Sequence, residues 1–232
     1  IHCSTEAVLA GAAGTGGMVD EDARPALSAM PGPYPRAKLL AEREAFAAAE
    51  GGQRVVVVAP TVPIGPGDRH LTPPARMLLG FLNDEYPAYL ETVLNLVDVR
   101  DVAAGHIQAA EYGRSGRRYL LAGVNLPLST LLAQLETLSG LPMTRRRIPY
   151  PVAHAAAWVG EWLADHLTHR PPTAPLTGVR LARAAARFDN HRARAELGVH
   201  FRPVEETLRA AITDYQARGL LRRAPAGGAE GA

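Results

Sequence analysis

The stretch YPRAKLLAEREAFAAAEGGQRVVVVAP, residues 34–60, contains a helix pattern, a two-glycine break and a strand pattern in immediate succession. A helix is predicted from about Pro35 to Ala49, because proline at an early helical position loses no hydrogen bond. Gly51-Gly52 ends it. The run Val55–Val58 is typical of a strand buried on both faces of a parallel sheet. With a strand end at residues 1–5, this predicts two parallel strands joined by a helical crossover.

The rest of the chain continues to alternate between strand and helix patterns. Strands are predicted over residues 54–60, 94–97 and 118–121, and helices over 74–82, about 98–112, 128–139, 152–166, 175–186 and 203–217. Asp98 or Asp101 is expected to cap the second of these helices. Residues 6–33 read as a long loop and 224–232 as a disordered tail. The alternation predicts an α/β fold with parallel strands.

Composition excludes several classes of protein. The 232 residues are 47% hydrophobic and 21% charged, as in a soluble globular protein of one or two domains. The net charge of +2 is too small to indicate a nucleic-acid partner, and no run of about 18 apolar residues predicts a membrane span. The single cysteine, Cys3, excludes an internal disulfide and is consistent with a cytoplasmic location. The tight run Arg145–Arg147 is interpreted as a solvated element end.

Tyr34 and Lys38 are the first candidates for chemistry. Residues four apart share one face of a helix. A phenol is a poor acid or base at neutral pH, and a neighbouring ammonium favours the phenolate. The helix N-terminus acts in the same direction. Lys38 is the only lysine in the chain, yet it stands at this spacing. The alternative is a surface tyrosine beside a solvated lysine.

Two further candidates follow predicted strands. A hydroxyl of Ser4-Thr5 could bind a substrate oxygen, because ligands of open parallel sheets bind at the carboxyl ends of strands. The alternative is a pair that satisfies turn backbone. Ala59-Pro60-Thr61-Val62 offers small residues that let a flat ring approach the backbone, although by itself it is a generic loop.

Taken in order, these motifs resemble a known family. The hydroxyl pair, Tyr-x-x-x-Lys, the segment VVVAPTVPIGPGD at 56–68 and LNLVDVRDVA at 94–103 look like the extended short-chain dehydrogenase/reductases. Within that superfamily the chain is most similar to the dihydroflavonol-4-reductase-like and hopanoid-associated sugar epimerase-like branch. RYLLAG at 118–123, AELG at 195–198 and PVEET at 203–207 fit that branch, so the resemblance covers about residues 1–221.

The resemblance implies roles for named residues. Thr5 would orient the substrate oxygen, Tyr34 would be the general acid/base, and Lys38 would hold the nicotinamide ribose and favour the phenolate. Pro60, Thr61 and Val62 would lie against the nicotinamide. The cofactor would be NAD or NADP, with NADP slightly favoured, and the hydride would move to or from a hydroxyl or ketone carbon.

The resemblance also implies partners and a division of the chain. The substrate would be a sugar nucleotide or a sterol-like or flavonoid-like alcohol or ketone, and a homodimer is compatible with the family. Sugar 4,6-dehydratases carry Asp-Glu after the threonine, whereas Glu6-Ala7 stands here, so dehydration is disfavoured. Residues 1–68 would belong to the Rossmann-type dinucleotide-binding domain, 69–221 mainly to the substrate-binding part, and 222–232 to a tail.

The glycine-rich turn that seats a pyrophosphate is not recognised in the sequence. Residues 11–17 are glycine-rich but follow the Ser-Thr strand, so they are interpreted as a substrate-side loop. The expectation is therefore an N-terminally truncated oxidoreductase or epimerase, inactive, aggregation-prone and a weak NADPH binder as these 232 residues alone. The alternative is a non-catalytic remnant that acts as a binding or assembly module.

Overall fold

The computed structural model describes residues 1–10, 17–163 and 176–223. The expected glycine-rich loop at 11–17 lies almost wholly outside this part, as do the expected tail at 224–232 and the end of the helix expected at 152–166. The strands are β1 His2–Cys3, β2 Met18–Val19, β3 Val57–Pro60, β4 Val62–Ile64, β5 Val93–Asp98, β6 Arg118–Leu121, β7 Val124–Pro127 and β8 Arg187–Phe188.

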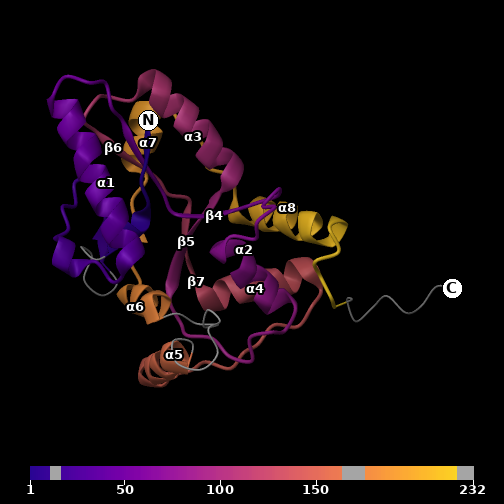
Figure 1. Ribbon diagram of the computed structural model, residues 1–232. Coiled ribbons are helices and arrows are strands. Elements are labelled where there is room, and N and C mark those ends of the chain that lie inside the picture. The colour runs from indigo at the N-terminus through magenta and orange to yellow at the C-terminus, as the bar shows by residue number, and fades with distance from the viewer. Residues whose placement is uncertain (11–16, 164–175, 224–232) are drawn as a thin grey trace.

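Helices connect these strands and cover them (Figure 1). The α-helices are α1 Pro33–Glu50, α2 Pro73–Leu82, α3 Val99–Tyr112, α4 Leu128–Ser139, α5 Tyr150–Leu163, α6 Leu176–Ala184, α7 His191–Leu197 and α8 Val204–Ala217. Two short 3₁₀ turns, η1 Glu6–Val8 and η3 Leu27–Ala29, lie between β1 and α1. The stretch expected as one long loop therefore contains short elements of its own.

The first sheet has the order β1-β3-β6, and its strands are parallel. The predicted crossover is confirmed, because β1 and β3 pair in parallel and α1 connects them. Alternate side chains of β6 point to opposite faces: Tyr119 and Leu121 pack against α3 and α7, whereas Leu120 packs with Ala59, Leu9 and the β8 residue Phe188. Both faces are buried, as the valine run predicted.

The second sheet is mixed. β4 is parallel to β5, and β5 is antiparallel to β7. Its apolar face packs against α2, α4 and α8 around Leu78, Leu131, Leu135 and Leu208. β3 leads into β4 with only Thr61 between them, so the two sheets adjoin at this residue. The α/β class with a parallel sheet and a smaller mixed part is confirmed.

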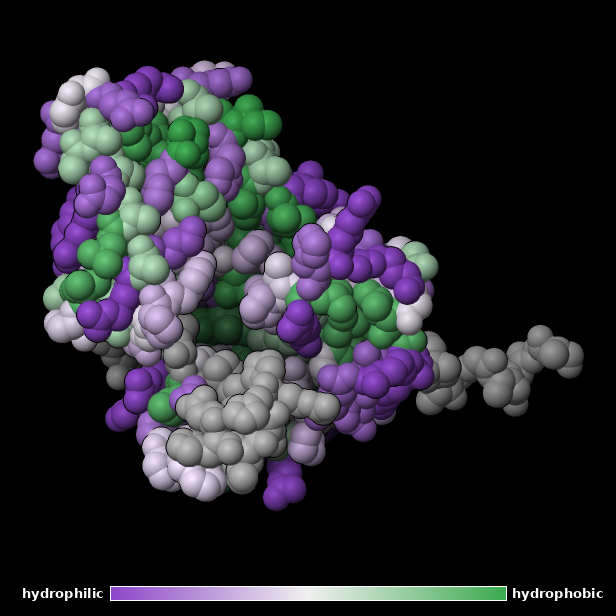
Figure 2. Space-filling model, in the orientation of Figure 1, coloured by the Kyte–Doolittle hydropathy of each residue, from purple (hydrophilic) through white to green (hydrophobic). Residues whose placement is uncertain are grey.

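The chain between β1 and α1 is tied to the far end of the sequence. β2 pairs in parallel with β8, so Met18 lies opposite Arg187. Figure 2 shows that this side of the molecule is hollowed near its centre, between the part that contains α1 and the part that contains α2 and α4. Hydrophobic residues line the bottom of the hollow. In the described part of the chain, no helix is long and apolar enough to cross a bilayer.

Candidate active site

The carboxyl ends of β1 and β3 lie side by side at one edge of the first sheet. The Ser4 amide donates to the Val58 carbonyl at 2.7 Å, which extends the parallel pairing one residue beyond β1. Thr5 therefore emerges next to the end of β3, where Thr61 follows Pro60. Ligands of parallel sheets bind at this edge. Ser4 and Thr5, the two candidate hydroxyl residues, directly follow β1 and therefore lie at it.

The Thr5 hydroxyl is already engaged in local hydrogen bonds. It caps η1 by accepting from the Ala7 amide at 3.3 Å, and it donates to the Glu6 carboxylate at 2.8 Å. Thr5 is only 8% exposed. Burial raises the pKa of the Glu6 carboxyl, and the hydrogen bond from Thr5 opposes that rise. Thr5 would have to turn away from Glu6 to donate to a substrate oxygen.

Ser4 presents the opposite situation. Its side chain is buried, and its hydroxyl has no hydrogen-bond partner in the described part of the structure. A buried hydroxyl without a partner loses free energy relative to water, so a ligand atom that reached it would relieve that cost. Sequence reasoning singled out the pair but assigned the substrate contact to Thr5 alone. The hydrogen-bond pattern makes Ser4 a candidate of equal standing.

Tyr34 is the second residue of α1 and projects into solvent, with 57% of its surface exposed. The helix begins with prolines at its first turn, which fixes the backbone there. Leu39 of α1 packs with Val8 of η1 and with Met30. The turn that follows Thr5 and the helix that carries Tyr34 therefore share one small core. Convergence of Thr5 and Tyr34 on one substrate atom stays a prediction.

Lys38 reaches the same strand. Its ammonium group donates to the Cys3 carbonyl at 3.1 Å, although the two residues are 35 positions apart. Lys38 therefore lies over Cys3, the last residue of β1, which is two residues before Thr5 in the chain. The alternative of a surface tyrosine beside a merely solvated lysine does not account for this contact. The role of Lys38 toward a ribose stays a prediction.

The polar surroundings of Lys38 include a cysteine–histidine contact. A hydrogen bond with His106 of α3 lowers the pKa of the Cys3 thiol, and Lys38 acts in the same direction. The same contact raises the pKa of His106, whose other ring nitrogen lies 2.8 Å from the Val102 carbonyl.

Pro60, Thr61 and Val62 form the junction between the two sheets. Pro60 ends β3 opposite Leu121, and Val62 begins β4 opposite Leu96. The buried Thr61 hydroxyl donates to the Asn95 side-chain oxygen at 2.8 Å. Contact with a nicotinamide stays a prediction, and the structure adds that Thr61 is fixed in place by a polar partner.

Asn95 and Asn125 were missed by sequence reasoning. Asn95 donates to the Asn125 carboxamide oxygen at 2.9 Å, and Asn125 both donates to and accepts from the backbone of Phe188. This chain of amides connects Thr61 to β8, and through β8 to β2. Each segment has a single polar residue, Asn95 in 93–97 and Asn125 in 124–127, and one polar residue in a strand does not identify its partner.

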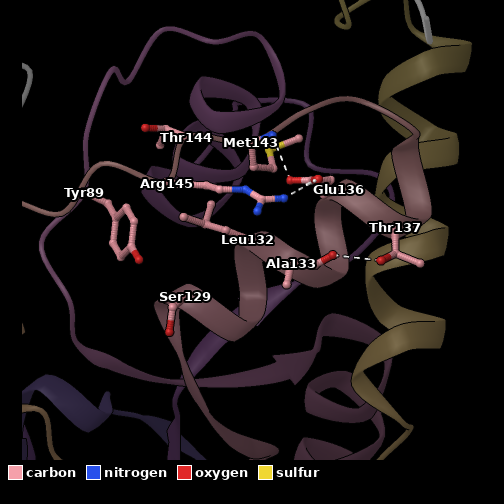
Figure 3. Close-up of a pocket in the computed structure, with 9 residues that line it drawn as sticks. All are labelled: Tyr89, Ser129, Leu132, Ala133, Glu136, Thr137, Met143, Thr144 and Arg145. Atoms are coloured by element: carbon pink, nitrogen blue, oxygen red, sulfur yellow. Dashed lines mark hydrogen bonds and ion pairs between the residues drawn. The ribbon is translucent and has the colours of Figure 1, made fainter.

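A pocket lies elsewhere, on the outer side of α4 (Figure 3). Its lining includes Tyr89, Ser129, Leu132 and Glu136, with Arg145 bound to Glu136 at 3.1 Å. It contains none of the predicted site residues. Among the described residues, no group of histidine, cysteine and carboxylate side chains could hold a metal ion.

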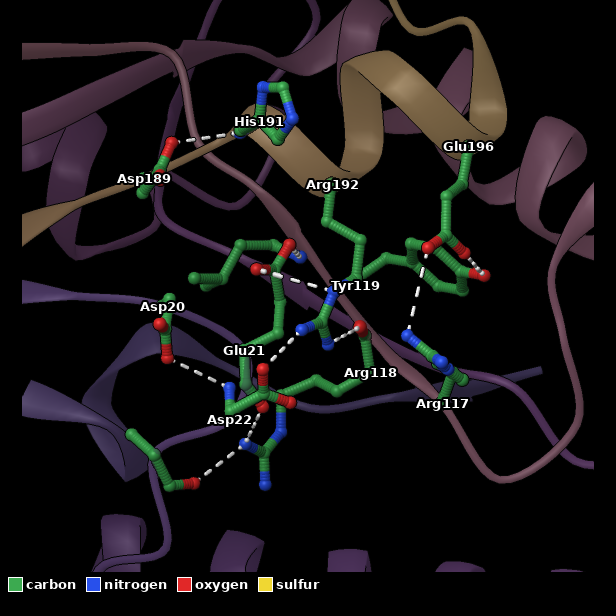
Figure 4. A network of polar contacts seen from close by, with 12 residues as sticks. Asp20, Glu21, Asp22, Arg117, Arg118, Tyr119, Asp189, His191, Arg192 and Glu196 are labelled. Carbon is green, nitrogen blue, oxygen red and sulfur yellow. Dashed lines mark hydrogen bonds and ion pairs between the residues drawn. The ribbon is translucent and has the colours of Figure 1, made fainter.

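A second polar network was also missed (Figure 4). Glu21 accepts from the Leu120 amide, and Arg118 donates to the carbonyls of Glu21 and Ala23. Arg192 of α7 pairs with Asp22 at 2.5 Å. These contacts fasten residues 21–23 against β6 and α7. Residues 21–23, which lie before Tyr34 in the chain, are therefore held in place by polar contacts.

Comparison with known proteins gives consistent results. The model of the NAD dependent epimerase/dehydratase family matches residues 1–122. The "Putative dihydroflavonol 4-reductase" of Synechocystis sp. is 36% identical over 226 residues, which are 96% of this chain and 65% of that protein. "Sterol demethylase protein B" of Methylococcus capsulatus is 30% identical over 193 residues, 81% of this chain and 58% of that protein.

A solved structure agrees at the level of the fold. The nucleoside-diphosphate-sugar epimerase of Pseudomonas aeruginosa superposes with a TM-score of 0.72 at 26% identity, covering 87% of this chain and 61% of that one. The chain thus spans about two thirds or less of the length of these relatives.

Proposed function

The chain belongs to the NAD dependent epimerase/dehydratase family, and we propose that it carries the proton-transfer site of an NAD(P)-dependent reductase that acts on a ketone or alcohol carbon. The observation that supports this most directly is the arrangement at β1. An exposed tyrosine begins the helix whose lysine, four residues on, binds the strand that ends at Thr5. Tyr34 is also open to an incoming molecule.

The proposed mechanism assigns one task to each side chain. Tyr34 transfers a proton to or from the substrate oxygen. Ser4 or Thr5 donates a hydrogen bond to that oxygen and holds it in place. Lys38, positioned by the Cys3 carbonyl, holds the nicotinamide ribose when the cofactor binds. The nicotinamide, when bound, supplies or accepts the hydride.

The residues present fit the nicotinamide end of such a cofactor. The Ser4 hydroxyl, which has no partner among the described residues, can bind a polar atom, and the small residues after β3 can lie against a flat ring. Both are at the edge of the sheet formed by the carboxyl ends of its strands. We propose Pro60, Thr61 and Val62 as the backbone against which the ring lies, and Tyr34 and Lys38 as the residues that face its ribose. The family description supports NAD, and the slight preference for NADP is our prediction.

The substrate class is inferred from the relatives. Proteins named as a dihydroflavonol reductase and a sterol demethylase component are the curated relatives compared above. Both names refer to ring systems that are apolar apart from hydroxyl and ketone groups. We propose a substrate of this kind, admitted through the hydrophobic hollow of Figure 2. The division into a cofactor-binding part up to about residue 68 and a mainly substrate-binding part up to 221, and a cytoplasmic location, are likewise proposals.

An epimerase of nucleotide sugars is the second candidate, favoured by the likeness to the Pseudomonas aeruginosa epimerase. Reduction consumes one reduced cofactor per product, whereas epimerisation returns the cofactor to its starting state. A non-catalytic binding module is the third reading. It predicts that the parent protein turns over neither a ketone or alcohol substrate nor a nucleotide sugar.

The test uses the protein at the full length that its gene encodes. NADPH and NADH oxidation is measured with a dihydroflavonol, a 3-oxosteroid and a UDP-sugar. Tyr34→Phe removes the proton donor and should lower turnover by about 10²–10⁴-fold while leaving cofactor binding nearly intact. Lys38→Ala should weaken both turnover and cofactor binding. Tyr112→Phe, another exposed tyrosine, is the matched control and should change neither.

Two outcomes would overturn the proposal. Equal loss of cofactor affinity in Tyr34→Phe and Lys38→Ala would contradict the separate roles. Full turnover in Tyr34→Phe would remove the tyrosine from the chemistry. Conversion of the UDP-sugar without net cofactor oxidation would decide for the epimerase.

A further inference from the structure

The exposed face of α5 is entirely apolar. Between Tyr150 and Trp162, every residue that the structure classes as exposed is hydrophobic or proline: Pro151, Val152, Ala155, Ala156, Trp158, Val159 and Trp162. The large side chains among them are 46–59% exposed. A helix on the surface of a globular protein normally turns polar residues to water. This face therefore has the composition of an interaction surface rather than of a solvated one.

The opposite face of α5 packs against the rest of the protein. Ala153 and Ala157 are buried and pack against Leu176 and Val179 of α6. The apolar outer face is thus not the side that anchors the helix to the fold. In Figure 1, α5 lies at the outer edge of the molecule, away from α3, α7 and α8.

Both tryptophans of the chain lie on this face, one helical turn apart. Tryptophan is enriched where an apolar medium meets water, because its ring is apolar and its N–H is a donor. The helix has 14 residues, fewer than the ~20 needed to span a bilayer. A helix of this length and pattern can lie in a membrane surface but cannot cross it.

The sequence on both sides of α5 is rich in arginine. The segments 141–163 and 176–188 contain six arginines and one glutamate. The whole chain has a net charge of only +2, so the remainder carries more acidic than basic residues. Arg145, Arg146 and Arg147 precede α5 in sequence, but Arg145 pairs with Glu136 and Arg147 with Glu91. Arg180 and Arg183 are exposed residues of α6, which packs against α5, and the Arg183 guanidinium lies 4.7 Å from the centre of the Tyr150 ring. Clustered arginines beside an apolar helix favour anionic lipid headgroups.

We propose that α5 docks the protein on an anionic lipid surface, with Trp158, Val159 and Trp162 inserted among the headgroups and the neighbouring arginines facing lipid phosphates. This goes beyond the proposed reductase activity and does not depend on it. A second copy of the chain is the competing occupant. It is disfavoured because the same cluster of arginines would face itself across a symmetric contact.

The test uses the tryptophan fluorescence of the chain, which reports on α5 alone. Protein is titrated with vesicles of phosphatidylcholine, and with vesicles that also contain phosphatidylglycerol. Emission should shift to shorter wavelength only with the anionic vesicles, and raised salt should weaken the effect. Val159→Glu and, separately, Ala155→Glu place a charge in the face and keep both tryptophans. Each should lower the partition coefficient by about tenfold or more.

Ile107→Glu is the matched control, because Ile107 is an exposed apolar residue of α3. It should bind vesicles as the parent protein does. Arg180→Gln combined with Arg183→Gln should lower the preference for the anionic vesicles. No emission shift, an equal shift with both vesicle types, or unchanged binding by both glutamate variants would overturn the proposal. A concentration-dependent dimer that Val159→Glu dissociates, without vesicle binding, would assign the face to self-association instead.

Discussion

The hydroxyl groups of Ser4 and Thr5 differ in whether they are free to bind a ligand. Ser4 and Thr5 are adjacent, yet the Ser4 hydroxyl has no partner among the described residues, whereas Thr5 caps η1 and donates to Glu6. The difference arises because the strand ends between them. The Ser4 backbone is still paired with Val58 of β3, whereas Thr5 is the cap residue of η1 and has an extended backbone.

Tyr215 gives a residue-scale prediction for stability. Burial raises the pKa of Tyr215 to about 12, and the charges of Asp68 and Asp214 act in the same direction. The folded state therefore keeps this phenol neutral at a pH where the unfolded state ionises it. Stability should be fully present below pH ~10 and should fall by roughly 2–3 kcal/mol as the pH rises to ~12.

Chemical denaturation as a function of pH checks this. Tyr215→Phe should remove much of the alkaline decline, and Tyr112→Phe, an exposed tyrosine, should keep it. An alkaline slope that is identical in all three proteins would show that Tyr215 is not the group responsible.

At the scale of elements, the two sheets meet closely at two places. Thr61 joins β3 to β4, and Gly123 lies between β6 and β7. Gly123 allows the backbone of β5 to pass next to it, because a side chain there would overlap the Leu96 carbonyl oxygen. The sheets can therefore adjoin only if this position has no side chain.

Gly123→Ala should lower the free energy of unfolding by about 3 kcal/mol or more, because the obstructing atom belongs to backbone and cannot rotate away. Gly51→Ala is the matched control. A methyl group at Gly51 would meet the Ala48 carbonyl at an ordinary contact distance of 3.4 Å, with φ of −72°. Thermal unfolding of both variants measures the difference. Equal stability of the two would contradict the close approach.

For the whole molecule, Arg118 is the point at which distant segments meet. It forms a buried ion pair with Glu42 of α1 and donates to the Glu21 and Ala23 carbonyls (Figure 4 shows the latter segment). Both side chains of the pair are at most 2% exposed. Helix α1, strand β6 and the segment before Tyr34 are thus held by one guanidinium. The position of residues 21–23 relative to α1 therefore depends on Arg118.

Glu42→Ala should destabilise the protein by about 3–5 kcal/mol, because Arg118 would be left buried without its counter-charge. The double variant Glu42→Leu with Arg118→Met should recover part of this loss but not all, since two backbone carbonyls would lose their donor. Glu205→Ala breaks an exposed pair with Arg209 and should change stability by less than about 1 kcal/mol. Denaturant titration compares the three. A double variant less stable than Glu42→Ala would contradict the charge argument.

The sequence by itself determined the elements that carry a strong local pattern. The helix at 128–139 and the strand at 118–121 lie where they were predicted, and Asp98 is the cap of α3. The order of Ser4-Thr5, Tyr34-x-x-x-Lys38 and the segment after β3 also indicated the family, because these residues are close in sequence or share one helix face.

Tertiary structure alone decided the rest. Strands β2 and β8 have two residues each, and such short strands exist only because each has the other as a partner. α7 is a helix of seven residues that packs on β6 and was not predicted, since a helix so short has little stability alone. The contacts of Thr61 with Asn95, of Lys38 with Cys3 and of Arg118 with Glu42 join residues 34 to 76 positions apart. Local propensity carries no information about such pairs, because their geometry is created only when the sheets and helices pack together.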